Sequence, residues 1–181
     1  MTSAGWEASD GDCFPSGRRT AAGSTSTPAL RPSLPSPAFR DAFRRRRCLI
    51  PADGFYEWQE RPEGKLPHYI RLQSGEPMGF AGIWSRWRDP ASGERLTTCA
   101  IVTGRPNEVV EALHNRMPVV LERSQWEAWL ETDGVEPDAL LAMLTPAPAE
   151  AMIAHPVSSL VNSVDNNLPE LISPLQERGS V

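Results

Sequence analysis

The pattern of apolar and polar positions predicts secondary structure from residue 37 onward. Pro37, a favoured first residue of helices, precedes Phe39 and Phe43, which lie four residues apart and so share one helical face. Short runs rich in β-branched and aromatic residues then predict strands at 48–50, 55–59, 68–72, 78–84 and 96–103. Because turn-forming segments such as Pro51-Ala52-Asp53-Gly54 separate these runs, we expect an antiparallel meander.

The second half of the chain predicts helices between further strands. The expected elements are a helix over 107–113, a strand at 119–121, a helix after Ser124, a helix over 137–144 and a last strand at 151–157. In the helix that Ser124 caps, Glu127 stands at the capping-box position, and Trp126, Trp129 and Leu130 form an apolar stripe. We therefore expect an α+β fold with mostly antiparallel strands and a few short helices.

Residues 1–36 follow neither periodicity. Gly, Ser, Thr, Pro and Ala dominate this stretch, and its large apolar residues are isolated. We expect 1–36 to be largely disordered, 37–175 to form one domain and 176–181 to be a tail. A chain of 181 residues that is 40% hydrophobic is long enough to bury a real core in one such domain.

The cysteines indicate neither a disulfide framework nor a zinc site. Cys13, Cys48 and Cys99 are odd in number and widely spaced, without a CxxC motif or a neighbouring histidine. We read Cys48 and Cys99 as small buried residues of strands, and we expect a reducing cytoplasm, no metal and no cofactor. No apolar run is long enough to span a bilayer, so no membrane association is expected.

Charge is unevenly distributed along the chain. The net charge of −5 argues against broad affinity for nucleic acid, yet residues 1–121 hold 16 basic and 13 acidic side chains, whereas 122–181 hold 2 and 10. Arginine makes up 17 of the 18 basic residues, which suits bidentate phosphate contacts, although a GC-rich genome gives the same bias. The composition permits a nucleic-acid partner without requiring one.

Glu57 is the first candidate for chemistry. In a strand it shares a face with Phe55 and Gln59, while Tyr56 and Trp58 point to the other face. A carboxyl group among aromatic rings loses solvation, so its pKa is expected to rise until it can donate a proton near neutral pH. The alternative is an ordinary solvent-facing glutamate of a strand.

His114 is the second candidate. It follows the predicted helix over 107–113, next to Arg116 and before Met117-Pro118, where a helix C-terminus can tune an imidazole. The alternative is a loop histidine that only bonds to the backbone. Our hypothesis is that Glu57 and His114 converge beside one cleft as an acid–base pair.

Three further residues are candidates for DNA contact: Arg47, Trp84 and Arg116. Arg47 ends the run Arg44–Arg47, which can meet phosphates, although such runs at helix ends are more often simply solvated. Trp84 and Trp87, with Arg86 and Arg88 between and after them, can stack on unpaired bases, or they can belong to the core.

Several segments in a fixed order resemble one protein family. The segments are Cys48–Trp58, Ile101–Thr103, His114–Leu121 and His155–Ser158 with Val161-Asn162. Together they resemble the SRAP family, the SOS-response-associated peptidases or abasic-site-processing proteins, over about 37–174. The resemblance implies a compact fold with a barrel-like antiparallel sheet, and a monomer that binds abasic sites in single-stranded DNA in the cytoplasm, at the nucleoid when engaged.

The resemblance also implies a mechanism. In the family, an N-terminal cysteine exposed by removal of methionine forms a thiazolidine with the ring-opened abasic sugar. The glutamate matching Glu57 assists ring opening and proton transfer, and the histidine matching His114 acts as acid and base. The peptidase label is attached to release of that N-terminus.

The N-terminal segment departs from the family pattern. The chain opens Met1-Thr2-Ser3 instead of Met-Cys-Gly-Arg, and the family's Asn-Ala-Arg…Glu segment is absent before Pro37. A back-translation of Ser26–Pro32 read in another frame gives Asn-Ala-Arg-Ala-Glu-Thr, so our hypothesis is a shifted frame or a misplaced start. We expect this chain to be deficient in crosslinking. The alternatives are a non-catalytic single-stranded DNA-binding module or an inactive fragment.

Overall fold

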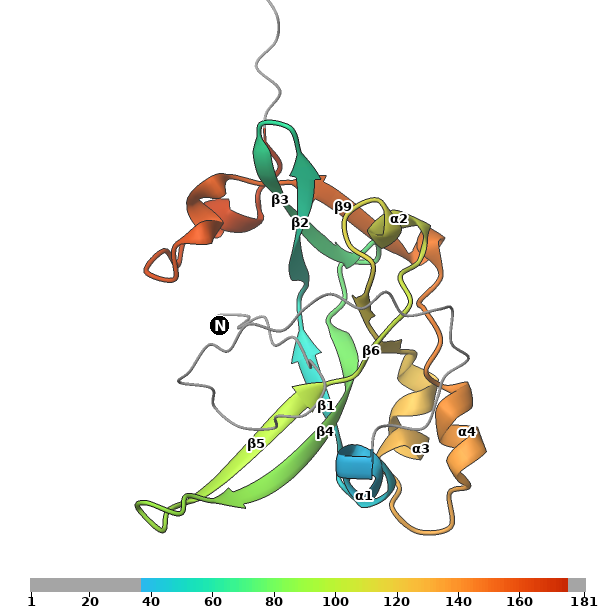
Figure 1. Ribbon diagram of the computed structural model, residues 1–181. Helices are drawn as coiled ribbons and strands as arrows, with labels where there is room; N and C mark the ends of the chain where they lie inside the picture. Colours follow the sequence, from blue (N-terminus) through green and yellow to red (C-terminus); the bar gives the residue numbers. More distant parts are fainter. Residues whose placement is uncertain (1–36, 176–181) are drawn as a thin grey trace, which may run out of the picture.

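A computed structural model describes residues 37–175, which form two main antiparallel sheets with short helices around them (Figure 1). The strands are β1 (Arg47–Ala52), β2 (Phe55–Arg61), β3 (Gly64–Leu72), β4 (Met78–Arg88), β5 (Arg95–Ile101), β6 (Thr103–Gly104), β7 (Met117–Pro118), β8 (Val120–Leu121) and β9 (Met152–Pro156). The helices are α1 (Pro37–Arg45), α2 (Glu108–Glu111), α3 (Trp126–Leu130) and α4 (Pro137–Ala142), with 3-10 turns η1 (Arg123–Gln125), η2 (Ala149–Ala151), η3 (Ser159–Asn162) and η4 (Pro169–Ile172). In this part of the chain no helix is both long and apolar enough to cross a bilayer.

The first sheet has the order β1-β4-β5, with β8 also paired to β4. One of its faces packs against α1, α3 and α4, which lie together in Figure 1. Phe43, Ala81, Trp129 and Leu140 are buried there in what we call the second core cluster. Because side chains alternate along β1 and β4, the opposite face of this sheet is free to build a different surface.

The second sheet has the order β2-β3-β9. Phe55 of β2 and its partner Ile70 of β3 enter the first core cluster, together with Phe80 of β4 and Val110 of α2. Phe55 and Phe80 meet edge to face with ring centroids 5.9 Å apart. The first core cluster thus joins the two sheets and α2.

The other face of the second sheet carries a row of aromatic rings. Tyr56 lies 5.3 Å from Tyr69, and Tyr69 lies 5.8 Å from His155, measured between ring centroids. The chain after β9 covers this row, since the Tyr56 hydroxyl donates to the carbonyl of Leu171 at 3.4 Å and His155 Nε2 lies 2.9 Å from the carbonyl of Ile172. The row therefore ties the C-terminal part of the domain to the sheet.

The α+β class with antiparallel strands is confirmed, but the predicted meander is wrong. β1 pairs with β4 and β2 with β3, so the first two strands lie in different sheets instead of forming a hairpin. Gly54 stands where the chain passes between them, and a Cβ atom there would come within 2.5 Å of the Tyr69 ring and of the Ile70 carbonyl. Among residues 37–175 the sheets also do not close, so the barrel-like sheet is corrected to two main open sheets and the two-stranded sheet β6-β7.

Most of the helices and strands predicted from the sequence are present, but one helix cap is formed by other residues than predicted. α2 begins after Asn107, and β9 matches the last predicted strand. The expected capping box at Ser124 and Glu127 is wrong, since Glu122 and Gln125 form it around η1, two residues earlier. The predictions for 1–36 and 176–181, including disorder and the shifted frame, lie outside the described residues.

Candidate active site and DNA-contacting residues

Glu57 lies in the middle of β2, on the face that turns toward the first core cluster. Phe55, two residues earlier on the same face, is buried in that cluster. Tyr56 and Trp58 point to the opposite face, where Trp58 Nε1 donates to Asn162 Oδ1 at 2.8 Å. Glu57 itself is partly buried, so its carboxyl group stands at the border between the apolar core and the surface.

His68 is the direct neighbour of Glu57 across β2 and β3. It is 8% exposed, and burial lowers the pKa of its imidazole, with further lowering by nearby Arg61 and His155. Its Nδ1 lies 3.1 Å from the carbonyl of Leu66, and because a carbonyl only accepts, Nδ1 carries the proton. Our sequence reasoning missed this neutral histidine, since only the β2–β3 register places it opposite Glu57.

His114 follows α2, as predicted, and its position is fixed by the backbone. Asn107 caps α2 by accepting from the Val110 amide at 3.1 Å, and the His114 amide donates to the Val110 carbonyl at 2.8 Å. The ring nitrogen Nδ1 lies 3.1 Å from the carbonyl and 3.2 Å from the amide nitrogen of Arg116. These contacts hold Nδ1 inside the loop and leave Nε2 as the ring nitrogen available to a substrate.

Sequence neighbours of both candidates pack in the same apolar cluster. Phe55, two residues before Glu57, and Met117, three residues after His114, belong to the first core cluster, and Leu113 packs against it. Segments that are far apart in the sequence thus share one core. That the acid and the imidazole act together stays a prediction.

Arg47 does not fit the expected role in DNA contact. Its side chain is 5% exposed and donates to the carbonyls of Phe43 at 2.7 Å and Trp129 at 2.6 Å, and to those of Arg44 and Glu131. Burial lowers the pKa of its guanidinium, an effect that the nearby carboxylate of Glu131 opposes. Arg47 is a structural link between α1, β1 and the end of α3.

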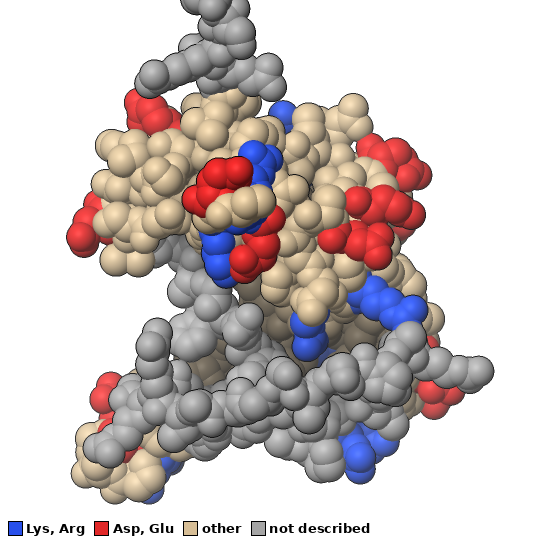
Figure 2. Space-filling view, turned by 45° about the horizontal axis from the view of Figure 1, so that its top comes forward, with Lys and Arg blue, Asp and Glu red and all other residues tan. Residues whose placement is uncertain are grey.

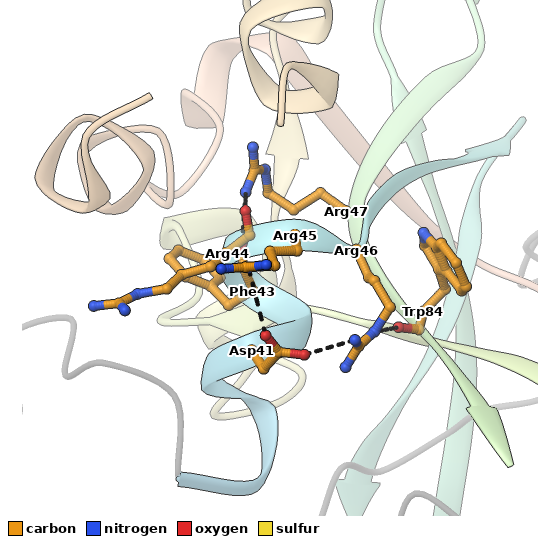
Figure 3. A network of polar contacts seen from close by, with 7 residues as sticks. All are labelled: Asp41, Phe43, Arg44, Arg45, Arg46, Arg47 and Trp84. Atoms are coloured by element: carbon orange, nitrogen blue, oxygen red, sulfur yellow. Dashed lines mark hydrogen bonds and ion pairs between the residues drawn. The ribbon is translucent and has the colours of Figure 1, made fainter. Parts of the chain in front are cut away.

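Two of the remaining arginines of the run, Arg45 and Arg46, lie beside Asp41, whereas the Arg44 side chain points away from it (Figure 3). Asp41 forms ion pairs with Arg46 at 2.6 Å and with Arg45 at 3.8 Å. Arg46 Nε also donates to the Trp84 carbonyl at 3.2 Å, which joins the run to β4. Exposed pairs of this kind contribute little to stability, and they reduce the positive charge that the run offers to a phosphate.

Trp84 and Arg116 are placed where contact with a ligand is feasible. Trp84 is partly buried, and the Arg86 guanidinium lies 5.3 Å from its ring centroid. Trp87 points to the other face of β4, so the two tryptophans do not build one stacking surface. Arg116 is exposed, two residues after His114.

The two described cysteines differ in their surroundings. Burial and the neighbouring Cys99 raise the pKa of the Cys48 thiol to about 11, so this thiol stays protonated at neutral pH. Cys99 is exposed, which makes the prediction of a buried residue wrong for this position. The reason is that Cys99 lies on the face of β5 that α1, α3 and α4 leave uncovered.

The fold and the two motifs define the class of protein. The family described as SOS response associated peptidase (SRAP) matches residues 32–164 of the chain. The protein therefore belongs to the SRAP family.

Among named relatives, the abasic site processing protein YoqW of Bacillus subtilis is 46% identical over 137 residues, which are 75% of this chain and 61% of YoqW. YobE of the same organism is 43% identical over 75% of this chain and 60% of its own length. The abasic site processing protein HMCES of Gallus gallus is 37% identical over 72% of this chain and 44% of its own length. The chain thus spans about three fifths of the bacterial relatives.

Solved structures agree with this assignment. A protein from Bacteroides thetaiotaomicron superposes with a TM-score of 0.73 at 26% identity, covering 79% of this chain and 62% of that protein. A protein from Bordetella bronchiseptica superposes with a TM-score of 0.59 at 29% identity, covering 66% and 59%. The fold is therefore shared with several experimentally determined structures.

Proposed function

We propose that this protein acts on abasic sites in single-stranded DNA. The relatives named above are abasic site processing proteins, and the matched family region contains both Glu57 and His114. The observation that supports the proposal is that Phe55, two residues before Glu57, and Met117, three residues after His114, pack in one apolar cluster. A protein acting on DNA in this way would work at the nucleoid.

Acid–base chemistry is what these residues offer. A ring-closed abasic sugar is a hemiacetal, and it opens to an aldehyde when a proton leaves its hydroxyl group and another reaches the ring oxygen. Glu57 supplies the proton to the ring oxygen, and His114 Nε2 exchanges protons in the same steps. An amine then attacks the aldehyde with loss of water, and a neighbouring thiol adds to the resulting C=N carbon to close a thiazolidine.

DNA contacts are assigned to Trp84 and Arg116. The Trp84 ring offers a surface on which an unpaired base stacks, and the exposed Arg116 guanidinium pairs with a phosphate beside His114. Arg47 is left out of this assignment because its donors are used inside the protein.

The acid–base step proposed for Glu57 and His114 does not depend on a cysteine of the protein and is testable separately.

The test supplies the aminothiol from solution. Single-stranded DNA with one abasic site is mixed with cysteine methyl ester, and thiazolidine formation is followed by mass spectrometry with and without protein. We expect the protein to accelerate the reaction and Glu57→Gln or His114→Gln to remove on the order of 100-fold of that acceleration. Glu60→Gln, on the same strand but exposed and paired with Lys65 at 2.8 Å, is the control. No acceleration by the unaltered protein refutes the proposal.

A second candidate function is a non-catalytic module that binds single-stranded DNA. It is favoured by the exposed arginines around Trp84. Salt-dependent binding to undamaged DNA, together with no effect of Glu57→Gln and His114→Gln in the trapping assay, is the result expected for this alternative.

A further inference from the structure

Side chains of the β4–β5 hairpin point alternately to its two faces. In the register of these strands, Trp84 lies opposite Cys99, Arg86 opposite Thr97, and Arg88 opposite Arg95. Directly paired residues of antiparallel strands point to the same face, so three arginines share one face with Trp84. We call Arg86, Arg88 and Arg95 the arginine face of the hairpin.

The arginine face is exposed and lacks neutralising partners. All three arginines are exposed, and among residues 37–175 none of them lies within ion-pair distance of a carboxylate. Asp89, the nearest acidic residue after β4, is used within the turn, where it accepts from the Ala91 amide at 2.9 Å and from the Ser92 hydroxyl at 2.7 Å. The positive charge of this face is therefore available to a ligand.

Without a bound anion, repulsion between the arginines of this face lowers the stability of the hairpin. Arg88 and Arg95 are direct cross-strand neighbours, and like charges in such pairs destabilise a sheet. Two of the side chains are nevertheless held in place: Arg86 lies over Trp84, and Arg88 Nε donates to the Gly93 carbonyl at 3.1 Å. A phosphate group placed between these guanidinium groups would offset their repulsion and accept several of their hydrogen bonds.

The arginine face continues from the candidate active site. Along one face of β4, Phe80 belongs to the first core cluster, Gly82 and Trp84 follow, and Arg86 and Arg88 extend toward the tip. Phe55 of β2, two residues before Glu57, belongs to the same cluster. Figure 1 shows the hairpin reaching away from the rest of the fold. A single strand of DNA that extends from the first core cluster can therefore run along the hairpin toward its tip.

The arginine run before β1 does not offer such a path. On the described part of the face drawn in Figure 2, both acidic and basic side chains are present. Arg45 and Arg46 are paired with Asp41, and Arg47 is buried. The hairpin is thus a described region in which arginine is concentrated and forms no ion pair with a described carboxylate.

We propose that the arginine face binds phosphates of the single-stranded DNA that flanks the reacting nucleotide. This inference rests on the proposed function for the choice of ligand, but it concerns the part of the strand that the acid–base pair does not touch. From Trp84 to Arg88 the face is about 14 Å long, since a strand rises about 3.4 Å per residue. At the rise of about 3.4 Å per nucleotide of a fully stacked strand, it serves at most roughly four nucleotides.

The experiment measures DNA affinity against salt concentration for the full chain. The variant Arg86→Gln/Arg88→Gln/Arg95→Gln keeps side chains of similar length without charge. For a single strand each lost phosphate contact lowers the slope of log affinity against log salt by about 0.7, so we expect a decrease of about 2. This corresponds to roughly 100-fold weaker binding of a 20-nucleotide strand at 0.1 M salt, relative to the unaltered protein.

The matched control is Arg123→Gln. Arg123 also lies over a tryptophan, with its guanidinium 5.0 Å from the Trp126 ring centroid, but Trp126 covers the opposite face of the first sheet at Gly79. We expect this variant to keep the salt dependence of the unaltered protein. Urea unfolding of each variant verifies that the fold is intact before binding is measured.

Two readouts separate this inference from the proposed function. With a four-nucleotide strand centred on the abasic site, the triple variant should bind as the unaltered protein does, and its trapping rate at saturating DNA should be unchanged. If Glu57→Gln loses the trapping reaction but the triple variant keeps the salt slope of the unaltered protein, the proposed function stands and only the inference about the arginine face is overturned. A reduced slope without any trapping activity supports the arginine face and overturns only the proposed chemistry.

Discussion

Replacing Arg47 with methionine removes the side chain that links α1, β1 and the end of α3. The guanidinium donates to four backbone carbonyls at the C-terminal ends of α1 and α3, where helices leave carbonyls without partners. It also lies 5.7 Å from the Trp129 ring centroid. Methionine preserves the packing of the aliphatic stem against Trp129 but satisfies none of the carbonyls.

The expected cost follows from these contacts. A hydrogen bond from a charged donor contributes about 1.5–3 kcal/mol, and a buried carbonyl left without a partner costs about 1–3 kcal/mol. Contributions within one network are not additive, so we take about 3–5 kcal/mol for the loss of all four bonds, which is less than their sum. We expect Arg47→Met to lower the free energy of unfolding by this last amount, and the melting temperature by roughly 10 °C.

Urea unfolding followed by tryptophan fluorescence measures the change, because Trp129 is completely buried. Arg44→Met is the control, since Arg44 is exposed and its replacement should change stability by less than about 0.5 kcal/mol. Equal stability of the two variants would show that the buried contacts of Arg47 contribute nothing. If folded Arg47→Met bound DNA with a weaker dependence on salt concentration, Arg47 would be a phosphate contact after all.

Three further predictions concern single positions. Gly54→Ala should lower the free energy of unfolding in urea by about 1–3 kcal/mol, because the new methyl group meets the Tyr69 ring and the Ile70 carbonyl. An unchanged free energy of unfolding would contradict the close packing at Gly54. At pH 7.5 iodoacetamide should modify exposed Cys99 much faster than Cys48, as peptide mass spectrometry resolves, and equal rates would contradict the raised pKa of Cys48. Because the pKa of His68 is lowered in the folded protein, the unfolded chain takes up the proton first as the pH falls. The free energy of unfolding should therefore decrease below about pH 6.5. His68→Gln should make this decrease smaller between about pH 6.5 and 5.

Local sequence patterns were sufficient to find most elements. Turn residues and alternation located β1, β2, β3, β4 and β9, because these signals act within a few residues of the chain. The same patterns did not reveal which strands pair. Gly54 illustrates the reason: it reads as part of an ordinary turn, and its actual requirement is the absence of a side chain beside Tyr69 from another strand.

The candidate site shows the same division. Glu57 and His114 were recognised from their motifs, whereas His68 was not, because its position opposite Glu57 depends on the β2–β3 register. Arg47 was misjudged because a run of four arginines has the same composition whether its members point inward or outward. The arginine face was also invisible in the sequence, since Arg95 joins Arg86 and Arg88 only through strand pairing.

The sequence by itself determined the family, the strand and helix segments, and the two residues proposed for acid–base chemistry, since all of these are carried by neighbouring residues. The tertiary structure alone decided which arginines are buried and which face solvent, which cysteine is exposed, and which strands pair. These properties depend on contacts between segments tens of residues apart, and such contacts exist only once the two sheets and their helices have packed together.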